Sequence, residues 1–116
     1  MYKTEFFKTC YNGRENGEIV YKFIKANGWA ELFETPAGEL IEIVLHKDTQ
    51  EGYWHSSETT TGLSISRTGR TRADVLEQIT PEFLSIISEA LKKPVNIKLK
   101  NKLADFILSE GAVTCI

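Results

Sequence analysis

The sequence predicts an α+β fold in which an N-terminal antiparallel β-meander of about five to six strands is packed by two to three C-terminal helices. In the first half of the chain, strand-forming residues alternate with turn residues. Apolar residues at helical spacing begin only after Gly69. Because strands and helices are segregated along the chain, a parallel βαβ arrangement is excluded, since it needs helices between the early strands.

Length and composition fit one globular domain, which we expect to span residues 1–116. The chain has 116 residues, of which 41% are hydrophobic and 26% are charged. Its longest apolar runs fall far short of the ~20 residues that a membrane span needs, so no membrane partner is expected. The net charge of −2 argues against binding polyanions by overall charge, although a local basic patch remains open.

The first half of the chain contains two predicted hairpins. Residues 3–11 and 18–25 flank a segment with two Asn-Gly steps, which favour a turn because they tolerate positive φ. Residues 29–35 and 39–47 flank a Pro-Ala-Gly turn. In the second of these segments, period-two spacing puts Ile41, Ile43 and Leu45 on one face of a strand, with Glu42, Val44 and His46 on the other. Two short strands, at 53–55 and 63–66, are expected to follow.

Two helix starts are readable after residue 69. In Thr71-Arg72-Ala73-Asp74, the threonine and the aspartate suit a capping box, which predicts a helix beginning here. Thr80-Pro81-Glu82 combines a hydroxyl cap, a proline at the first helical position and an acid in the first turn. These are either two helices or one helix kinked at Pro81.

The C-terminal part is expected to hold one more strand and one more helix. Val95, Ile97 and Leu99 alternate with polar residues, which predicts a short strand at a sheet edge. Asn101 is expected to cap a last helix, and Gly111 to end it.

The segment Arg67–Arg72 is the most unusual in the chain. It holds Arg67, Arg70 and Arg72, and lies where a strand is expected to pass into a helix. Helix N-termini favour anions, and guanidinium groups bind phosphate or carboxylate with two donors at once. A second basic stretch, Lys92–Lys102, includes Lys98 and Lys100, and the two stretches would form one basic face if they meet. The alternative is that these are solvated loop charges.

Aromatic residues give a second set of candidates. Tyr53-Trp54-His55, if exposed, would suit a protein-interface anchor or a platform for base stacking. Packing in the core or on the sheet is the alternative for Trp54, and equally for Trp29.

Catalytic and metal-binding patterns are weak, so we expect no enzyme, no metal site and no cofactor. The two histidines, His46 and His55, have no cysteine near them in sequence. Cys10 with either histidine, or carboxylates such as Glu42 and Glu58, would be needed for a small hydrolase. We expect Cys10 and Cys115 to be reduced thiols. Because the first residues do not form a secretory signal, we expect a cytoplasmic protein.

The stretch from Gly52 to about Leu91 resembles the HicB family of small antitoxins. The matching run is Gly69-Arg70-Thr71-Arg72-Ala73-Asp74-Val75-Leu76, preceded by Gly62-Leu63-Ser64-Ile65. The family's motif is Gly-x-Thr-x-x-acid-Ala-Leu, and Val75 stands here in place of its alanine. The unit is also similar to small proteins of bacteriophages and mobile elements, including anti-CRISPR inhibitors. The resemblance implies binding to a host or defence protein, and assigns no catalytic residue.

Together these patterns favour a small non-catalytic binding protein, an inhibitor or neutraliser from a phage or mobile element that acts on a protein partner. The expected contact residues are Arg67, Arg70, Arg72, Tyr53, Trp54, His55, Lys98 and Lys100. One alternative is a nucleic-acid-binding accessory protein that uses Arg67–Arg72 and Lys92–Lys102, and another is a small hydrolase. A homodimer formed by sheet extension also remains open.

Overall fold

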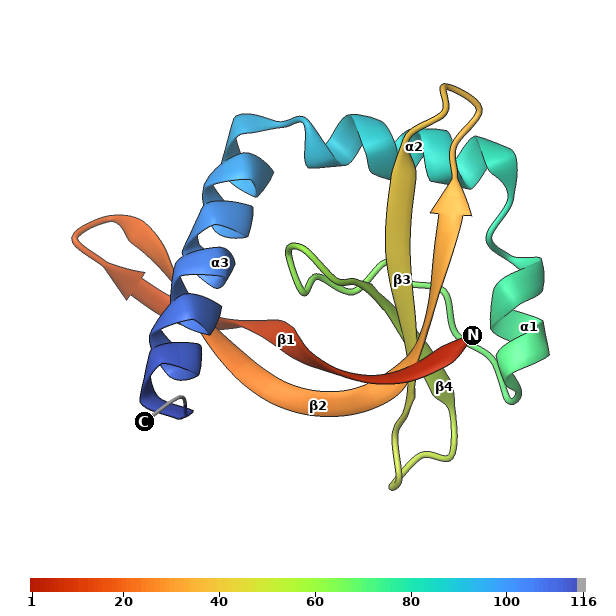
Figure 1. Ribbon diagram of the computed structural model, residues 1–116, viewed down its shortest axis with the longest axis horizontal. Coiled ribbons are helices and arrows are strands. Elements are labelled where there is room, and N and C mark those ends of the chain that lie inside the picture. Colours follow the sequence, from red (N-terminus) through yellow and green to blue (C-terminus); the bar gives the residue numbers. More distant parts are fainter. Residues whose placement is uncertain (115–116) are drawn as a thin grey trace.

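Four antiparallel strands come first along the chain and three helices follow, as Figure 1 shows. The computed structural model describes residues 1–114, with side chains through residue 110. The strands are β1 (Tyr2–Glu15), β2 (Glu18–Glu34), β3 (Leu40–Lys47) and β4 (Trp54–Glu58), and they form one sheet in that order. The helices are α1 (Arg72–Glu77), α2 (Pro81–Leu91) and α3 (Pro94–Thr114). The predicted α+β class is confirmed, with four strands in place of five to six.

The strand count is lower because β2 belongs to both predicted hairpins. This 17-residue strand pairs with β1 up to Ala30 and with β3 from Trp29 onward. Gly28 lies where β3 joins, and a Cβ atom there would lie 2.6 Å from the carbonyl oxygen of Leu45. A glycine therefore allows the two backbones to approach. The strand expected at 63–66 is also reduced, to one isolated bridge from Ser64 to Ser57.

The turn after β4 returns to the outer edge of β1. The Thr9 amide donates to the Gly62 carbonyl at 2.9 Å, and the Thr9 hydroxyl donates to the Thr61 carbonyl at 2.6 Å. Gly62 has a φ of +70°, and a Cβ atom there would lie 2.4 Å from the Phe7 carbonyl oxygen. Only glycine fits this position without a backbone shift.

Helices α1 and α2 cover one side of β3. Their starts are as the sequence predicts: Thr71 and Asp74 form a capping box, and Thr80 caps α2 with Pro81 in its first turn. They are two helices rather than one kinked helix. The largest buried cluster joins them to β3 through Ile41, Ile43, Leu45, Val75, Ile79, Leu84 and Ile87.

The predicted strand at 95–99 is wrong, because these residues begin α3. Leu99 and Leu103, four residues apart, are buried, whereas Val95 and Ile97 are exposed. The Phe106 ring lies 5.3 Å from that of Phe7 on β1. The helix therefore packs on the long β1–β2 hairpin (Figure 1).

The expected ends of that last helix are also wrong. Asn101 lies inside α3 rather than at its cap, and Gly111 falls within the helix rather than ending it. Pro94 is the first residue of α3, where its missing N–H costs no helical hydrogen bond.

Candidate binding face

The arginine segment is fixed to the first half of β4. The Trp54 amide donates to the Gly69 carbonyl at 2.7 Å, and the Gly69 amide donates back to Trp54 at 3.1 Å. The Ser56 hydroxyl donates to the carbonyl of Arg67 at 2.6 Å. These bonds hold residues 67–69 beside β4, and the capping box at Thr71 then turns the chain into α1.

Arg72, the first residue of α1, lies against two tryptophans from different strands. Its guanidinium carbon is 4.8 Å from the centre of the Trp29 ring and 5.5 Å from that of Trp54. The Lys3 ammonium lies 5.9 Å from the Trp29 ring, and Lys3 and Trp29 are partners in the β1–β2 register. At these distances the quadrupole of each ring attracts the cation above it.

The other two arginines also meet aromatic rings. The guanidinium of Arg67 lies 3.8 Å from the centre of Phe83 on α2, and that of Arg70 lies 5.9 Å from Tyr53. Tyr53 is 40% exposed, so this part of the surface is open to a partner. We name the arginine–aromatic face by its members: Arg67, Arg70, Arg72, Trp29, Tyr53, Trp54 and Phe83.

In the described part of the chain, the guanidinium groups of this face are not paired with acids. Among the side chains described, through residue 110, none of the three arginines forms a salt bridge or donates a side-chain hydrogen bond. Arg67 and Arg72 are half-buried against their rings, so they are more than freely solvated loop charges. Their N–H edges therefore remain available to carboxylate or phosphate.

The other candidate residues do not join this face. His55 follows Trp54 on β4, so its side chain points to the opposite side of the sheet, where its ring stacks on His46 at 5.9 Å. Lys98 and Lys100 lie on α3, which Figure 1 places on the far side of the molecule from α1. Lys98 is 3.8 Å from the carboxylate of Glu18. The two basic stretches therefore do not form one surface.

Part of the site could not be read from the sequence. The placement of Trp29, in the core or on the surface, stayed open and Phe83 was not a candidate, because both meet their arginines through contacts distant in sequence. Asp48, Glu51 and His55 were not expected to lie together, but their potential ligand atoms lie within 4.8 Å of one another. An aspartate, a glutamate and a histidine spaced across one tight loop between strands would have been the available signal.

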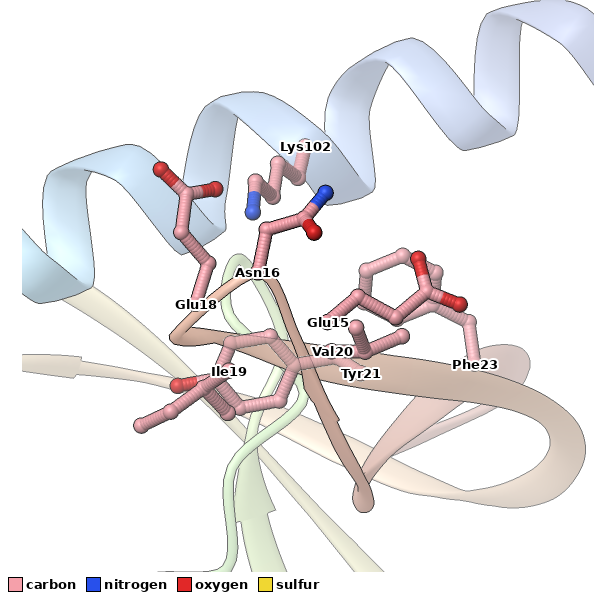
Figure 2. A pocket seen from close by; sticks show the side chains of 8 residues that line it. All are labelled: Glu15, Asn16, Glu18, Ile19, Val20, Tyr21, Phe23 and Lys102. Atoms are coloured by element: carbon pink, nitrogen blue, oxygen red, sulfur yellow. The ribbon is translucent and has the colours of Figure 1, made fainter.

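A further hollow lies on the long β1–β2 hairpin. An open depression of about 550 Å³ lies between the turn of the first hairpin and Lys102 of α3 (Figure 2). Its polar side chains are carboxylates, one amide, one phenol and one ammonium, with no histidine, cysteine or aliphatic hydroxyl. Cys10 is half-buried and carries no disulfide, whereas Cys115 lies outside the described residues.

Comparisons with known proteins add no relative. No protein-family model matches the chain, and no curated protein or solved structure shows significant similarity to it. None of the helices in the described residues has the length and apolar character needed to cross a membrane.

Proposed function

We propose that this protein is a non-catalytic binding protein that docks its arginine–aromatic face on an acidic surface of a protein partner. The observation that carries the proposal is the state of three guanidinium groups, each set against an aromatic ring and none paired with a carboxylate among the described side chains. Covering the partner's surface would inhibit or neutralise it, in line with the phage and mobile-element proteins that residues 52–91 resemble.

Stacked arginines suit this role energetically. A guanidinium held on a ring has already lost much of its side-chain freedom, so less entropy remains to be lost when a carboxylate binds. Arginine, tryptophan and tyrosine are also the residues that most often dominate protein–protein binding energy. Tyr53 and Arg70, both exposed, would make the first contacts, and Arg72 would remain supported by the two tryptophans.

The charge layout favours a protein over a nucleic acid. Binding along a nucleic-acid backbone gains from a row of cations that follows the phosphates. The lysine stretch lies at the end of α2 and on α3, and two of its members are near acids: Lys98 at Glu18, and Lys92 at Glu39. The cations at the arginine–aromatic face, the three arginines and Lys3, match a short acidic segment better than a long polyanion.

The hydrolase alternative has less support from the geometry. The Glu58 carboxylate is buried and accepts four hydrogen bonds from Thr60 and Thr61. The Glu42 carboxylate accepts a hydrogen bond from the Tyr2 hydroxyl. His46 Nε2 lies 3.1 Å from the Ser57 hydroxyl, so it too has a structural partner. These residues therefore act within the fold.

The experiment compares two labelled polyanions with the intact protein. Fluorescence anisotropy measures binding of an Asp/Glu-rich peptide and of a single-stranded DNA with the same charge, across a range of salt concentration. The triple variant Arg67→Ala, Arg70→Ala, Arg72→Ala is paired with a control that loses equal charge elsewhere, Lys93→Ala, Lys98→Ala, Lys100→Ala.

Peptide binding that the arginine variant loses and the lysine control keeps would support the proposal. DNA binding that is tighter than peptide binding, falls steeply with salt and is lost in both variants would favour the nucleic-acid alternative. Peptide binding unaffected by the arginine substitutions would overturn the assignment of this face.

A further inference from the structure

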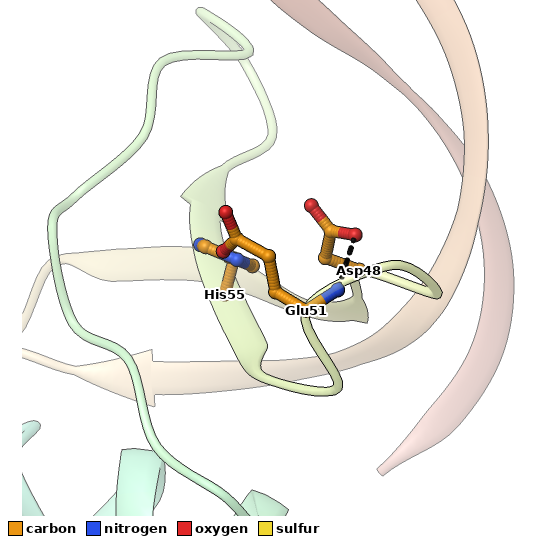
Figure 3. A group of neighbouring side chains, drawn as sticks. All are labelled: Asp48, Glu51 and His55. Atoms are coloured by element: carbon orange, nitrogen blue, oxygen red, sulfur yellow. Dashed lines mark hydrogen bonds between the residues drawn. The ribbon is translucent and has the colours of Figure 1, made fainter.

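We propose that Asp48, Glu51 and His55 form a binding site for a divalent transition-metal cation, with Zn²⁺ as the best match to the donor atoms. Each residue offers one ligand atom, and the three atoms lie within 4.8 Å of one another. Figure 3 shows the Glu51 carboxylate over the ring of His55 on β4, with the Asp48 carboxylate to one side and hydrogen-bonded to the Glu51 amide. The site lies across the sheet from Trp54, and the inference does not depend on the function proposed for the arginine–aromatic face.

The loop between β3 and β4 holds Asp48 in place before any ion binds. Its Oδ1 accepts the amide of Gln50 at 2.8 Å and the amide of Glu51 at 3.2 Å. The Asp48 amide donates to Tyr53 and the Asp48 carbonyl accepts from Gly52, both at 2.9 Å. The loop therefore closes on itself and brings residues 51 and 55 back beside Asp48. The second carboxylate oxygen, Oδ2, is left available as a ligand.

His55 provides a second and independent observation. Its Nε2 is buried and has no hydrogen-bond partner among the described residues. Buried polar atoms are nearly always paired, so an orphaned ring nitrogen calls for an explanation such as an ion or an ordered water. An imidazole is also the nitrogen ligand that zinc sites use most naturally together with carboxylates.

The local charges are compatible with a cation. Within the described part of the chain, neither Asp48 nor Glu51 forms a salt bridge, so both carboxylates are free to share an ion. Lys8 and Lys47 line the same cavity, of about 430 Å³, together with Asp48 and His55. These ammonium groups repel a divalent cation, so removing one of them should strengthen metal binding.

The donor set selects among metals. Zinc binds histidine nitrogen at ~2.0–2.1 Å and carboxylate oxygen at ~2.0–2.2 Å, commonly with three protein ligands and one water. Mg²⁺ and Ca²⁺ prefer all-oxygen sites, so one imidazole with two carboxylates suits them less well. Glu51 is exposed, so its carboxylate has room to move toward an ion held by Asp48 and His55.

The test is isothermal titration calorimetry of Zn²⁺, with Mg²⁺ and Ca²⁺ alongside, into the intact protein in a non-chelating buffer. Asp48→Asn and Glu51→Gln remove charge but keep an oxygen, so the Asp48 turn can still form, and His55→Gln removes the ring. We expect one Zn²⁺ per chain, and an affinity roughly tenfold or more weaker in each variant. The control Glu34→Gln, an exposed carboxylate on β2, should leave affinity unchanged. Lys8→Met should strengthen binding.

Two further measurements test whether Cys10 or His46, rather than the proposed residues, binds the zinc ion. Zinc binding that disappears in Cys10→Ser would assign the ion to a thiol and overturn the proposal. In ¹⁵N spectra of the histidine rings, Zn²⁺ should shift the His55 resonances, and a shift confined to His46 would also overturn it. The absence of any zinc binding, or binding that Asp48→Asn and His55→Gln leave intact, would do the same. Circular dichroism of each variant checks that the fold is retained.

Discussion

The guanidinium group of Arg72 lies 4.8 Å from the centre of the Trp29 ring, joining the first residue of α1 to the middle of β2. The centre of the Trp54 ring lies 5.5 Å from the same guanidinium carbon, so the Arg72 side chain links α1 to two strands of the sheet. The contact fixes the orientation of the arginine segment as well as supporting α1. One group thus serves both the fold and the proposed binding face.

Arg72→Ala should lower the free energy of unfolding by about 1 kcal/mol, since a cation–π contact at a partly exposed site is worth roughly that amount. Urea unfolding measures this change, and the fluorescence of Trp29 and Trp54 should change in the native state. Lys98→Ala, which removes a charge from an exposed ion pair on α3, should change stability by less than about 0.5 kcal/mol. Equal effects of both substitutions would contradict the proposed role of Arg72.

Gly62→Ala should destabilise the protein by more than about 1 kcal/mol, because the new Cβ atom meets the Phe7 carbonyl oxygen and φ is positive. The matched control is Gly13→Ala, at a φ of +93° with no atom within 4 Å of the added Cβ. The control carries the backbone strain without the clash. Gly62→Ala should therefore show the larger fall in urea midpoint. Equal midpoints would show that the β1 backbone at Phe7 shifts away from the new Cβ atom at little cost in stability.

Glu58→Gln should destabilise the fold by about 1–3 kcal/mol, the cost of leaving buried hydrogen-bonding groups unmatched. Its two oxygens accept four bonds from the backbone and hydroxyl groups of Thr60 and Thr61. An amide keeps one oxygen and places an NH₂ group against two donors. Chemical denaturation of this variant beside Glu34→Gln, at an exposed site, measures the difference.

Stability should fall as the solution is acidified from about pH 6.5 to about pH 4, in part through His46. Burial, together with the positive charges of Lys8 and His55, lowers the pKa of His46 from 6.5 to about 4. Between these values the unfolded chain binds the proton and the folded chain does not, so the unfolding free energy rises with pH across this window.

The matched variant for this pH effect is His46→Phe, which keeps an aromatic ring at the position and removes the proton. Urea midpoints at several pH values between 4 and 7 measure both proteins. The variant should lose less stability than the wild type on acidification, and parallel curves would show that other groups cause the effect.

Features encoded within a few residues could be predicted from the sequence. The capping box of Thr71 with Asp74 and the Thr80-Pro81 start of α2 depend on neighbours three residues away, and both are confirmed. The strand predicted at 95–99 rested on the alternation of Val95, Ile97 and Leu99 with polar residues. Val95 and Ile97 are exposed, so this alternation does not mark the buried face of a strand. The burial of Leu99 and Leu103, four residues apart, decides in favour of a helix.

The arginines of the candidate site could be predicted from the sequence, but their aromatic partners could not. The three arginines stand out in the sequence because they crowd into six residues. Their aromatic partners come from β2, the start of β4 and α2, and the register that places Trp29 beside β3 depends on how far β2 continues. Pairings of that kind are set by the whole sheet, so no local pattern carries them.

The hydrogen bond from the Thr9 amide to Gly62 also shapes the order of folding. It joins an early strand to a turn that follows three further strands, so it forms only when a long intervening loop has been closed. Non-local contacts of this kind slow folding. Deuterium exchange at the Thr9 amide would therefore report opening of the sheet, with protection exceeding that of amides in the β1–β2 turn.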